Sequence, residues 1–147
     1  MTDPVGQRFV PMLVYADAPA AIEFLCRAFG FEEKHRLPMP DGRIGHAELE
    51  YAGSRVTLSS EYPEMGLASP QQLPTRHMQL TCYVDDVDAH YAHAAAEGAT
   101  ILEAVVDQFY GDRNYRAVDC EGNRWIFSTR VRDVSNEELE KAVAEMA

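Results

Sequence analysis

Four polar residues could share one face of a predicted hairpin and act together on a small molecule. Ala52-Gly53 predicts a two-residue turn, which places Glu48 opposite Thr57 and His46 opposite Ser59. Alternate residues of a strand point the same way, so these side chains lie on one face. A histidine titrates near neutral pH, and burial can raise the pKa of a glutamate into that range. His46 and Glu48 could therefore transfer a proton or anchor a ligand.

The same hairpin also allows a structural interpretation, in which its polar face is solvated or paired across the strands. Glu50 lies opposite Arg55 beside the turn, and we expect an exposed ion pair that stabilises the fold little. We expect the same of Asp119 and Arg124 in a second hairpin. The other face of the first hairpin is apolar and should lie under a helix, with Ala47, Leu49, Val56 and Leu58.

The second hairpin is predicted to present an apolar face with one phenol. A two-residue turn at Glu121-Gly122 would place Ile126 and Tyr115 on the same face, where both could contact a ligand. Trp125 alternates with that set, so we expect it to pack in the core. The corresponding cross-strand pairs are Ala117 with Ile126 and Tyr115 with Ser128.

A loop with two aromatic residues precedes the second hairpin. Phe109 and Tyr110 stand beside Gly111 and could cap a pocket and stack on a planar ligand, with Arg113 close by. The alternative is a loop that Phe109 merely anchors, in which Arg113 pairs with Asp112 or another neighbour.

The elements that position these residues come from a duplicated half-domain. Tyr15–Asp17 and Tyr83–Asp85 are each followed by a glycine thirteen residues after the aspartate, at an offset of 68. Gly53–Arg55 returns as Gly122–Arg124 at an offset of 69. A co-linear series of this length predicts two copies of one β-α-β-β-β unit.

Each copy is predicted to hold one strand, one helix and three further strands. The first has strands at 10–15, 31–37, 46–51 and 54–60, with its helix after the N-cap Asp17. The second has strands at 78–84, 100–106, 115–120 and 123–129, with its helix at 86–97. Residues 61–75 form a linker, and Ser135 opens a capping box for a helix over 135–145. We therefore predict a single α+β domain over 1–147, with modules at about 7–60 and 76–130 whose open sheet faces enclose a cleft.

The charge and cysteine content narrow the function classes. Thirteen Lys and Arg against 24 Asp and Glu give a net charge of −11, which disfavours nucleic acid and anionic membranes as partners. The same charge favours an uncharged or weakly cationic ligand. Three widely spaced cysteines, no signal peptide pattern and no run of ~20 apolar residues predict a cytoplasmic protein.

Five segments taken together resemble one known family. They are Ala21–Gly30, Gly45–Leu49, Tyr83–Asp88, Phe109–Arg113 and Asp119–Trp125. In this combination the chain resembles the vicinal-oxygen-chelate superfamily of glyoxalase, bleomycin-resistance and extradiol dioxygenase proteins, and most of all an uncharacterised glyoxalase-like branch. The resemblance implies two concave sheets forming a cupped site, and a homodimer.

The resemblance also implies where a metal ion would bind in metal-using members. The four ligand positions fall on Val10, Thr57, Gln79 and Ile126. Only Gln79 could ligate, whereas a divalent ion needs several converging donors. We therefore expect neither metal nor cofactor; a non-standard site built from His46, Glu48 and Gln79, with His77, is the alternative.

Two functions are consistent with this pattern. The first is a binding protein that holds a small, partly aromatic compound in a metal-free cleft, for resistance or sequestration. Its ligand-binding residues would be Thr57, Gln79, Phe109, Tyr110, Arg113, Tyr115 and Ile126. The second is a metal-independent lyase or isomerase acting on a small carbonyl compound, with His46 or Glu48 as the general base.

Overall fold

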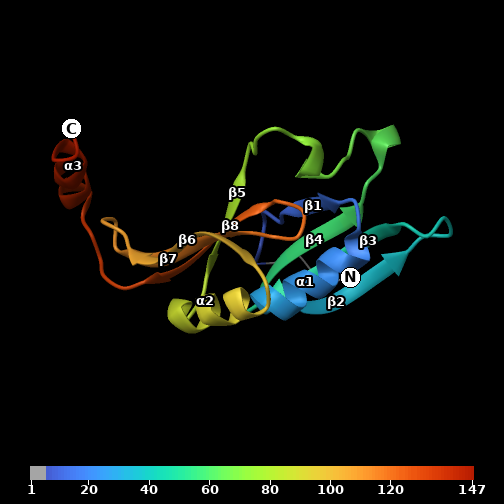
Figure 1. Ribbon diagram of the computed structural model, residues 1–147, viewed down its shortest axis with the longest axis horizontal. Coiled ribbons are helices and arrows are strands. Elements are labelled where there is room, and N and C mark those ends of the chain that lie inside the picture. The colour runs from blue at the N-terminus through green and yellow to red at the C-terminus, as the bar shows by residue number, and fades with distance from the viewer. Residues whose placement is uncertain (1–5) are drawn as a thin grey trace. The chain divides into compact units, whose positions relative to one another are not determined.

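A computed structural model describes residues 6–147 (Figure 1). These residues form eight strands in two four-stranded sheets, together with three α-helices. The chain divides into two compact units. The first unit consists of the chain up to Arg76 together with Asp119–Asn123, and the second of His77–Val118 and Arg124–Ala147. Each unit is a β-α-β-β-β module, so the predicted duplication is confirmed.

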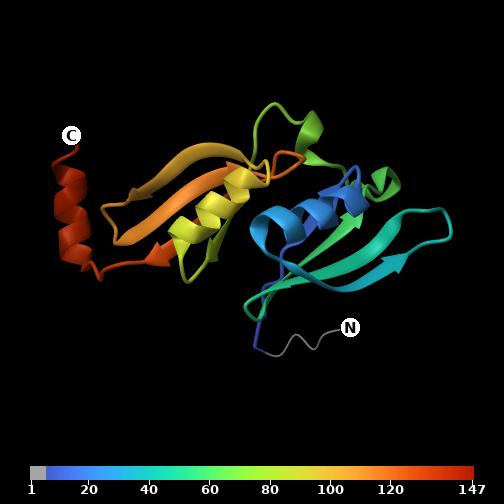
Figure 2. The same ribbon diagram turned by 60° about the horizontal axis from the view of Figure 1, so that its bottom comes forward.

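The first unit forms around one sheet of order β1-β4-β3-β2, in which only β1 and β4 run parallel. Helix α1 starts where Asp17 accepts a hydrogen bond from the Ala20 N–H at 3.1 Å, and ends at Gly30, whose φ is 82°. One side of α1 is buried, and Figure 2 shows this helix lying over the sheet. The elements are β1 (Met12–Tyr15), α1 (Ala18–Phe29), β2 (Glu32–Pro38), β3 (Ile44–Tyr51) and β4 (Ser54–Ser60).

The register of the β3–β4 hairpin agrees with the sequence-based expectation. Glu48 lies opposite Thr57 and Glu50 opposite Arg55. Ala52 and Gly53 both have positive φ, 48° and 87°, as a two-residue hairpin turn of this hand requires. The residues alternating with Glu48 and Thr57 face α1 and are buried, namely Ala47, Leu49, Val56 and Leu58.

The second unit repeats this order as β5-β8-β7-β6, with β5 and β8 parallel. Helix α2 begins after the N-cap Asp86, which lies 69 residues after Asp17. Tyr15 and Tyr83 end β1 and β5 at an offset of 68, so the offset grows by one residue before the helix, and α2 begins as predicted. The elements are β5 (Gln79–Tyr83), α2 (Val87–Ala96), β6 (Thr100–Asp107), β7 (Asp112–Val118), β8 (Arg124–Arg130) and α3 (Asn136–Ala144).

The register predicted for the β7–β8 hairpin is also wrong by one residue. The turn is longer than two residues, because the Asp119 N–H donates to the Asn123 carbonyl at 3.0 Å. Arg116 therefore lies opposite Ile126, and Tyr115 opposite Phe127. A shift of one residue moves a side chain to the other face of a sheet. Tyr115 consequently faces α2, and Arg116 takes its place on the open face.

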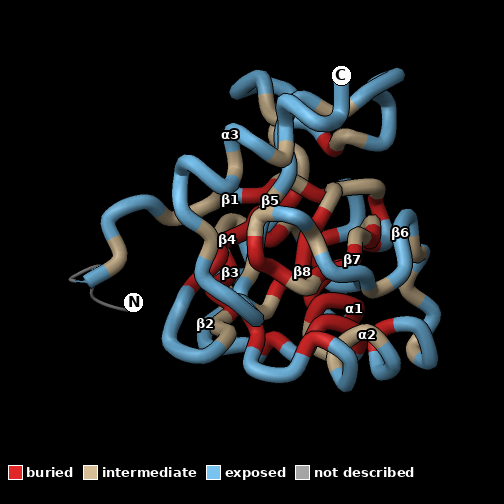
Figure 3. Tube along the Cα trace, turned by 90° about the vertical axis from the view of Figure 1, so that its left-hand side faces the viewer, coloured by how far each residue is buried: buried red, intermediate tan, exposed pale blue. Residues whose placement is uncertain are grey.

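The linker after β4 and the segment after β8 are mostly exposed. The linker contains two short 3₁₀ helices, Pro63–Met65 and Pro70–Gln72. Helix α3 is capped by Ser135, whose hydroxyl accepts the Glu138 N–H at 3.1 Å, and it carries no buried residue (Figure 3). None of the helices within residues 6–147 has the length and apolar character that crossing a bilayer requires.

Candidate functional site

The open face of the first sheet carries a charged cluster formed by His46, Glu48 and Arg55. Glu48 is only 4% exposed and Arg55 7% exposed. His46 Nε2 and Arg55 Nη1 each lie 3.7 Å from the same atom, Glu48 Oε1. The expected exposed pair of Arg55 with Glu50 is therefore wrong, because Arg55 is buried and lies beside Glu48.

Neighbouring strands position the charged cluster from both sides. On β4, Thr57 is buried and its hydroxyl donates to the Pro11 carbonyl at 3.0 Å. On β2, His35 lies opposite Glu48, with its ring centroid 6.4 Å from that of His46. Together these strands hold two imidazoles, a carboxylate and a guanidinium on one sheet face.

One atom of the charged cluster has no hydrogen-bond partner within residues 6–147. His46 Nε2 is buried, and its 3.7 Å distance to Glu48 exceeds hydrogen-bond length. A buried polar atom left unsatisfied costs about 1–3 kcal/mol. This imidazole nitrogen can therefore accept a hydrogen bond from a bound polar group, or donate one to it.

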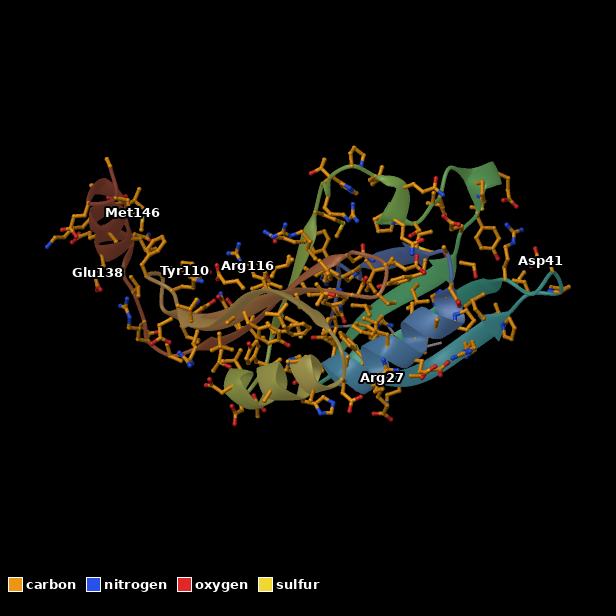
Figure 4. The ribbon with its side chains drawn as sticks, viewed as in Figure 1. Arg27, Asp41, Tyr110, Arg116, Glu138 and Met146 are labelled. Atoms are coloured by element: carbon orange, nitrogen blue, oxygen red, sulfur yellow. The ribbon has the colours of Figure 1, made fainter. Side chains whose placement is uncertain are left out.

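The open face of the second sheet is formed by residues of β7 and β8 that sequence analysis did not select. Figure 4 shows the Arg116 side chain on the side of β7 away from α2. Arg116 Nε and Ser128 Oγ are buried and, among the described residues, have no hydrogen-bond partner. Ile126, a predicted ligand contact, lies opposite Arg116 on this face and is 9% exposed. The sequence analysis missed Arg116 because it assumed a two-residue turn between β7 and β8, which gave the wrong register.

Tyr115, by contrast, belongs to the core beneath α2. It is fully buried, and its hydroxyl lies 2.6 Å from His90 Nδ1. Its ring stacks on Phe127 at 5.4 Å. The open-face phenol expected from the two-residue turn is therefore wrong in orientation.

The aromatic loop forms the tip of the β6–β7 hairpin. Phe109 is 39% exposed and contacts Tyr110 edge to face at 5.3 Å. The Tyr110 hydroxyl accepts a hydrogen bond from Asn114 at 2.9 Å. Arg113 pairs with Asp88 at 2.9 Å and Asp107 at 3.1 Å. For Arg113 the structure agrees with the alternative interpretation, in which it pairs with neighbouring carboxylates.

The four positions that the family resemblance implies for metal ligands do not offer the donors that a divalent ion needs. Val10 and Ile126 have no donor atoms, and the Thr57 hydroxyl is engaged with a backbone carbonyl. Gln79 is exposed and lies opposite Arg124. Within residues 6–147 no three His, Cys, Asp or Glu side chains gather in a way that could hold a metal ion.

A second buried polar centre in the first unit comes from the acidic turn Asp119–Asn123. The Tyr15 hydroxyl donates to Asp119 at 2.6 Å. The Glu121 carboxylate accepts the backbone N–H groups of Ala16 and Asp17 at 2.7 and 2.8 Å, and the Ser69 hydroxyl at 2.6 Å. Asp119 was expected to pair with Arg124, and this expectation is wrong. These contacts join residues about 50 to 105 positions apart, so no local pattern could have predicted them.

The hydrogen bond from Tyr15 to the acidic turn is expected to make the protein less stable at alkaline pH. Burial, reinforced by the Asp119 carboxylate, raises the pKa of Tyr15 well above its usual value of 10.0. The stability due to the protonated phenol is therefore complete below about pH 10 and is lost as the pH rises further, at about 1.4 kcal/mol per pH unit. We therefore expect the Tyr15→Phe variant to lose less stability than the wild type between about pH 9 and pH 11, as measured by urea unfolding. Identical pH profiles for the two proteins would contradict this assignment.

Two open hollows lie elsewhere on the first unit. One, of about 510 Å³, is lined by residues of α1 and β2, including Cys26 and Arg36. The other, of about 500 Å³, lies near Asp17, Arg43 and Glu61. Neither contains a predicted site residue, and the charged groups named here already have partners, such as Glu33 for Arg36 and Glu64 for Arg43. They therefore do not compete with the open sheet face as a candidate site.

Comparison with known proteins gives a consistent family. The model of the "Glyoxalase/Bleomycin resistance protein/Dioxygenase superfamily" matches residues 8–127. An uncharacterised protein of Mycobacterium bovis is 36% identical over 137 residues, covering 91% of this chain and 90% of that protein. An uncharacterised protein of Mycobacterium tuberculosis shows the same identity, with 81% of its length covered.

Solved structures share the fold. TioX from Micromonospora sp. ML1 is 29% identical with a TM-score of 0.68, covering 88% of this chain and all of that one. A glyoxalase/bleomycin resistance protein/dioxygenase family enzyme from Burkholderia phytofirmans has a TM-score of 0.67 at 24% identity, covering 82% of this chain and 95% of that one. The two modules and the C-terminal helix therefore match the glyoxalase/bleomycin-resistance fold.

Proposed function

This chain belongs to the glyoxalase/bleomycin resistance protein/dioxygenase superfamily, and from that premise we propose that it binds a small, partly aromatic organic molecule without a metal ion, for resistance or sequestration. The observation that carries the proposal is the buried charged cluster with its unsatisfied His46 Nε2. Protein interiors rarely leave such atoms without partners, so a ligand group is the natural partner. The absence of suitable donors at Val10, Thr57 and Ile126 supports metal-free binding.

The proposed contacts differ from the full set expected from the sequence. His46, Glu48 and Thr57 would orient polar groups of the ligand on the first sheet. Ile126 and Gln79 would contact the ligand on the open face of the second sheet, and Phe109 and Tyr110 remain proposed aromatic contacts. Tyr115 and Arg113 do not enter the proposal, because one is buried under α2 and the other is paired with two aspartates.

A second function is favoured by one feature of the charged cluster. His46 Nε2 has no hydrogen bond and stands near a buried carboxylate, as a general base requires. We propose as the alternative a metal-independent lyase or isomerase acting on a small carbonyl compound. In that case His46 or Glu48 would remove a proton from a carbon next to the carbonyl.

The variant Glu48→Gln separates these possibilities, with Glu50→Gln on the same strand face as the matched control. Aromatic and carbonyl compounds would first be screened by ligand-induced thermal shift, because a ligand at 100 times its Kd stabilises a protein by about 2.7 kcal/mol. For a binding protein we expect Glu48→Gln to weaken binding of the best compound about tenfold or more. Glu50→Gln should leave that affinity unchanged.

For an enzyme, Glu48→Gln would abolish turnover while binding survives. Unchanged binding and turnover in Glu48→Gln would show that Glu48 is only part of the scaffold. Stoichiometric zinc, nickel or iron in the purified protein would contradict metal-free binding.

The remaining features of the proposal concern assembly and location. We propose a homodimer, supported by family membership, and a cytoplasmic location, supported by the free thiols of Cys26, Cys82 and Cys120. The net charge of −11 supports a small molecule, and not nucleic acid, as the partner.

A further inference from the structure

Two arginines on the open face of the second sheet have no acidic partner among residues 6–147. Most other described arginines pair with carboxylates, in the ion pairs Arg27–Glu23, Arg36–Glu33, Arg43–Glu64, Arg55–Glu48, Arg113–Asp88, Arg130–Asp112 and Arg132–Glu138. Arg116 and Arg124 are exceptions, in a protein with eleven excess negative charges. Glu103, opposite Arg116 on β6, is exposed and accepts a hydrogen bond from Gln108 at 3.1 Å instead.

The strand register places these two arginines side by side. Arg116 lies opposite Ile126, and Arg124 lies opposite Val118. The two arginines are therefore diagonal neighbours on one face, with backbones about 7–8 Å apart. Arg116 also takes in this unit the place of Glu48 in the first, since Glu48 lies opposite Thr57, 69 residues before Ile126. At this equivalent position the duplication thus carries a carboxylate in the first unit and a guanidinium in the second.

Two buried hydrogen-bond donors on this face lack an acceptor among the described residues. Arg116 Nε and Ser128 Oγ are buried, yet neither has a hydrogen-bond partner in the described part of the chain. Ser128 itself is only 1% exposed. Both groups donate hydrogen bonds, and the arginine cannot give up its proton. Their common requirement is an acceptor, and an anionic one satisfies both the donors and the charge.

We propose that Arg116, Arg124 and Ser128 form an oxyanion subsite, so that the ligand carries a carboxylate or a phosphate group. This inference rests on the proposed binding function and specifies its ligand class. A planar guanidinium donates two parallel hydrogen bonds to either group, and the serine hydroxyl supplies a third donor. Ile126 lies opposite Arg116, and between Arg124 and Ser128 on its own strand β8, so it offers an apolar contact for an attached ring.

An anionic ligand differs from the uncharged or weakly cationic ligand expected from the sequence. That expectation used the net charge of the whole chain. At physiological ionic strength, charges are screened beyond about 8 Å, so a local pair of arginines outweighs distant carboxylates.

Three small probes test the subsite directly: benzoate, phenyl phosphate and the neutral isostere benzamide. Each would be titrated into the ¹⁵N-labelled full chain while the arginine Nε–Hε resonances are followed by NMR. We expect benzoate or phenyl phosphate to shift the Arg116 signal, and benzamide not to. Arg116→Gln should weaken anion binding about 10- to 100-fold. The control Arg27→Gln removes the same charge from the exposed side of helix α1 and should leave anion binding unchanged.

The outcomes separate the inference from the function on which it rests. Equal binding of benzoate and benzamide, with no effect of Arg116→Gln, would overturn the oxyanion subsite while small-molecule binding stands. No binding of either anion would also overturn it, and the thermal-shift screen with Glu48→Gln would still decide the binding function. If Arg116→Gln fails to fold, Arg116→Lys keeps the charge without the planar fork, and unweakened anion binding in that variant would overturn the subsite. Preference between benzoate and phenyl phosphate identifies the oxyanion.

Discussion

Replacement of Glu121 by alanine is expected to lower the free energy of unfolding by about 3–5 kcal/mol, because one buried carboxylate satisfies three donors. It accepts the N–H groups of Ala16 and Asp17 directly before α1, and the Ser69 hydroxyl in the linker. Glu121 is itself only 6% exposed, so water does not readily replace it. Urea unfolding followed by circular dichroism measures the loss.

Two further variants make this result specific. Glu121→Gln keeps one side-chain oxygen as an acceptor, so we expect an intermediate loss of stability. Glu140→Ala removes the same charge from the exposed surface of α3 and should change stability little. A Glu121→Ala protein as stable as Glu140→Ala would show that the acidic turn does not hold the first unit together.

Replacement of Trp125 by alanine should cost about 3–5 kcal/mol, the range for removing a large aromatic side chain from a core. Trp125 is 1% exposed and stacks on Phe127 with ring centroids 5.9 Å apart and an interplanar angle of 4°. It is the only tryptophan, so unfolding of the variant must be followed by circular dichroism and not by fluorescence.

The neighbouring residue provides the control for that substitution. Ile126→Val changes the opposite face of the same strand, and we expect a loss of only about 0.5–1.5 kcal/mol. Because Trp125 faces α2, the folded fraction of Trp125→Ala should bind benzoate or phenyl phosphate as tightly as wild type does. Weakened anion binding in Trp125→Ala without loss of stability would assign Trp125 to the ligand face instead.

The two hairpins show where reasoning from the sequence succeeds and where it stops. In the first, Ala52-Gly53 forms the turn by itself, since both residues adopt positive φ, and the register of Glu48 with Thr57 follows by counting. In the second, Asp119 accepts the N–H groups of Glu121 and Asn123 at 3.0 Å and thereby lengthens the turn. Counting from a two-residue turn therefore failed by one residue.

The candidate site was predicted in the same uneven way. His46 and Glu48 depend on the first hairpin, and the structure places them together. Arg55 was assigned to the surface because it stands next to a turn, whereas its burial depends on packing that local spacing does not report. Arg116 was missed and Tyr115 misplaced because both depend on the second turn.

The sequence by itself determined the duplicated β-α-β-β-β unit, the helix caps and the first hairpin, because these depend on periodicity and on hydrogen bonds between near neighbours in the chain. Only the tertiary structure decided which residues of β7 face α2 and which face away. The acidic turn is held by hydrogen bonds to residues about 50 to 105 positions away in the chain, namely Tyr15, Ala16, Asp17 and Ser69. A strand alternates with a period of two residues, so one added residue in the turn places a different set of side chains on the open face of the sheet.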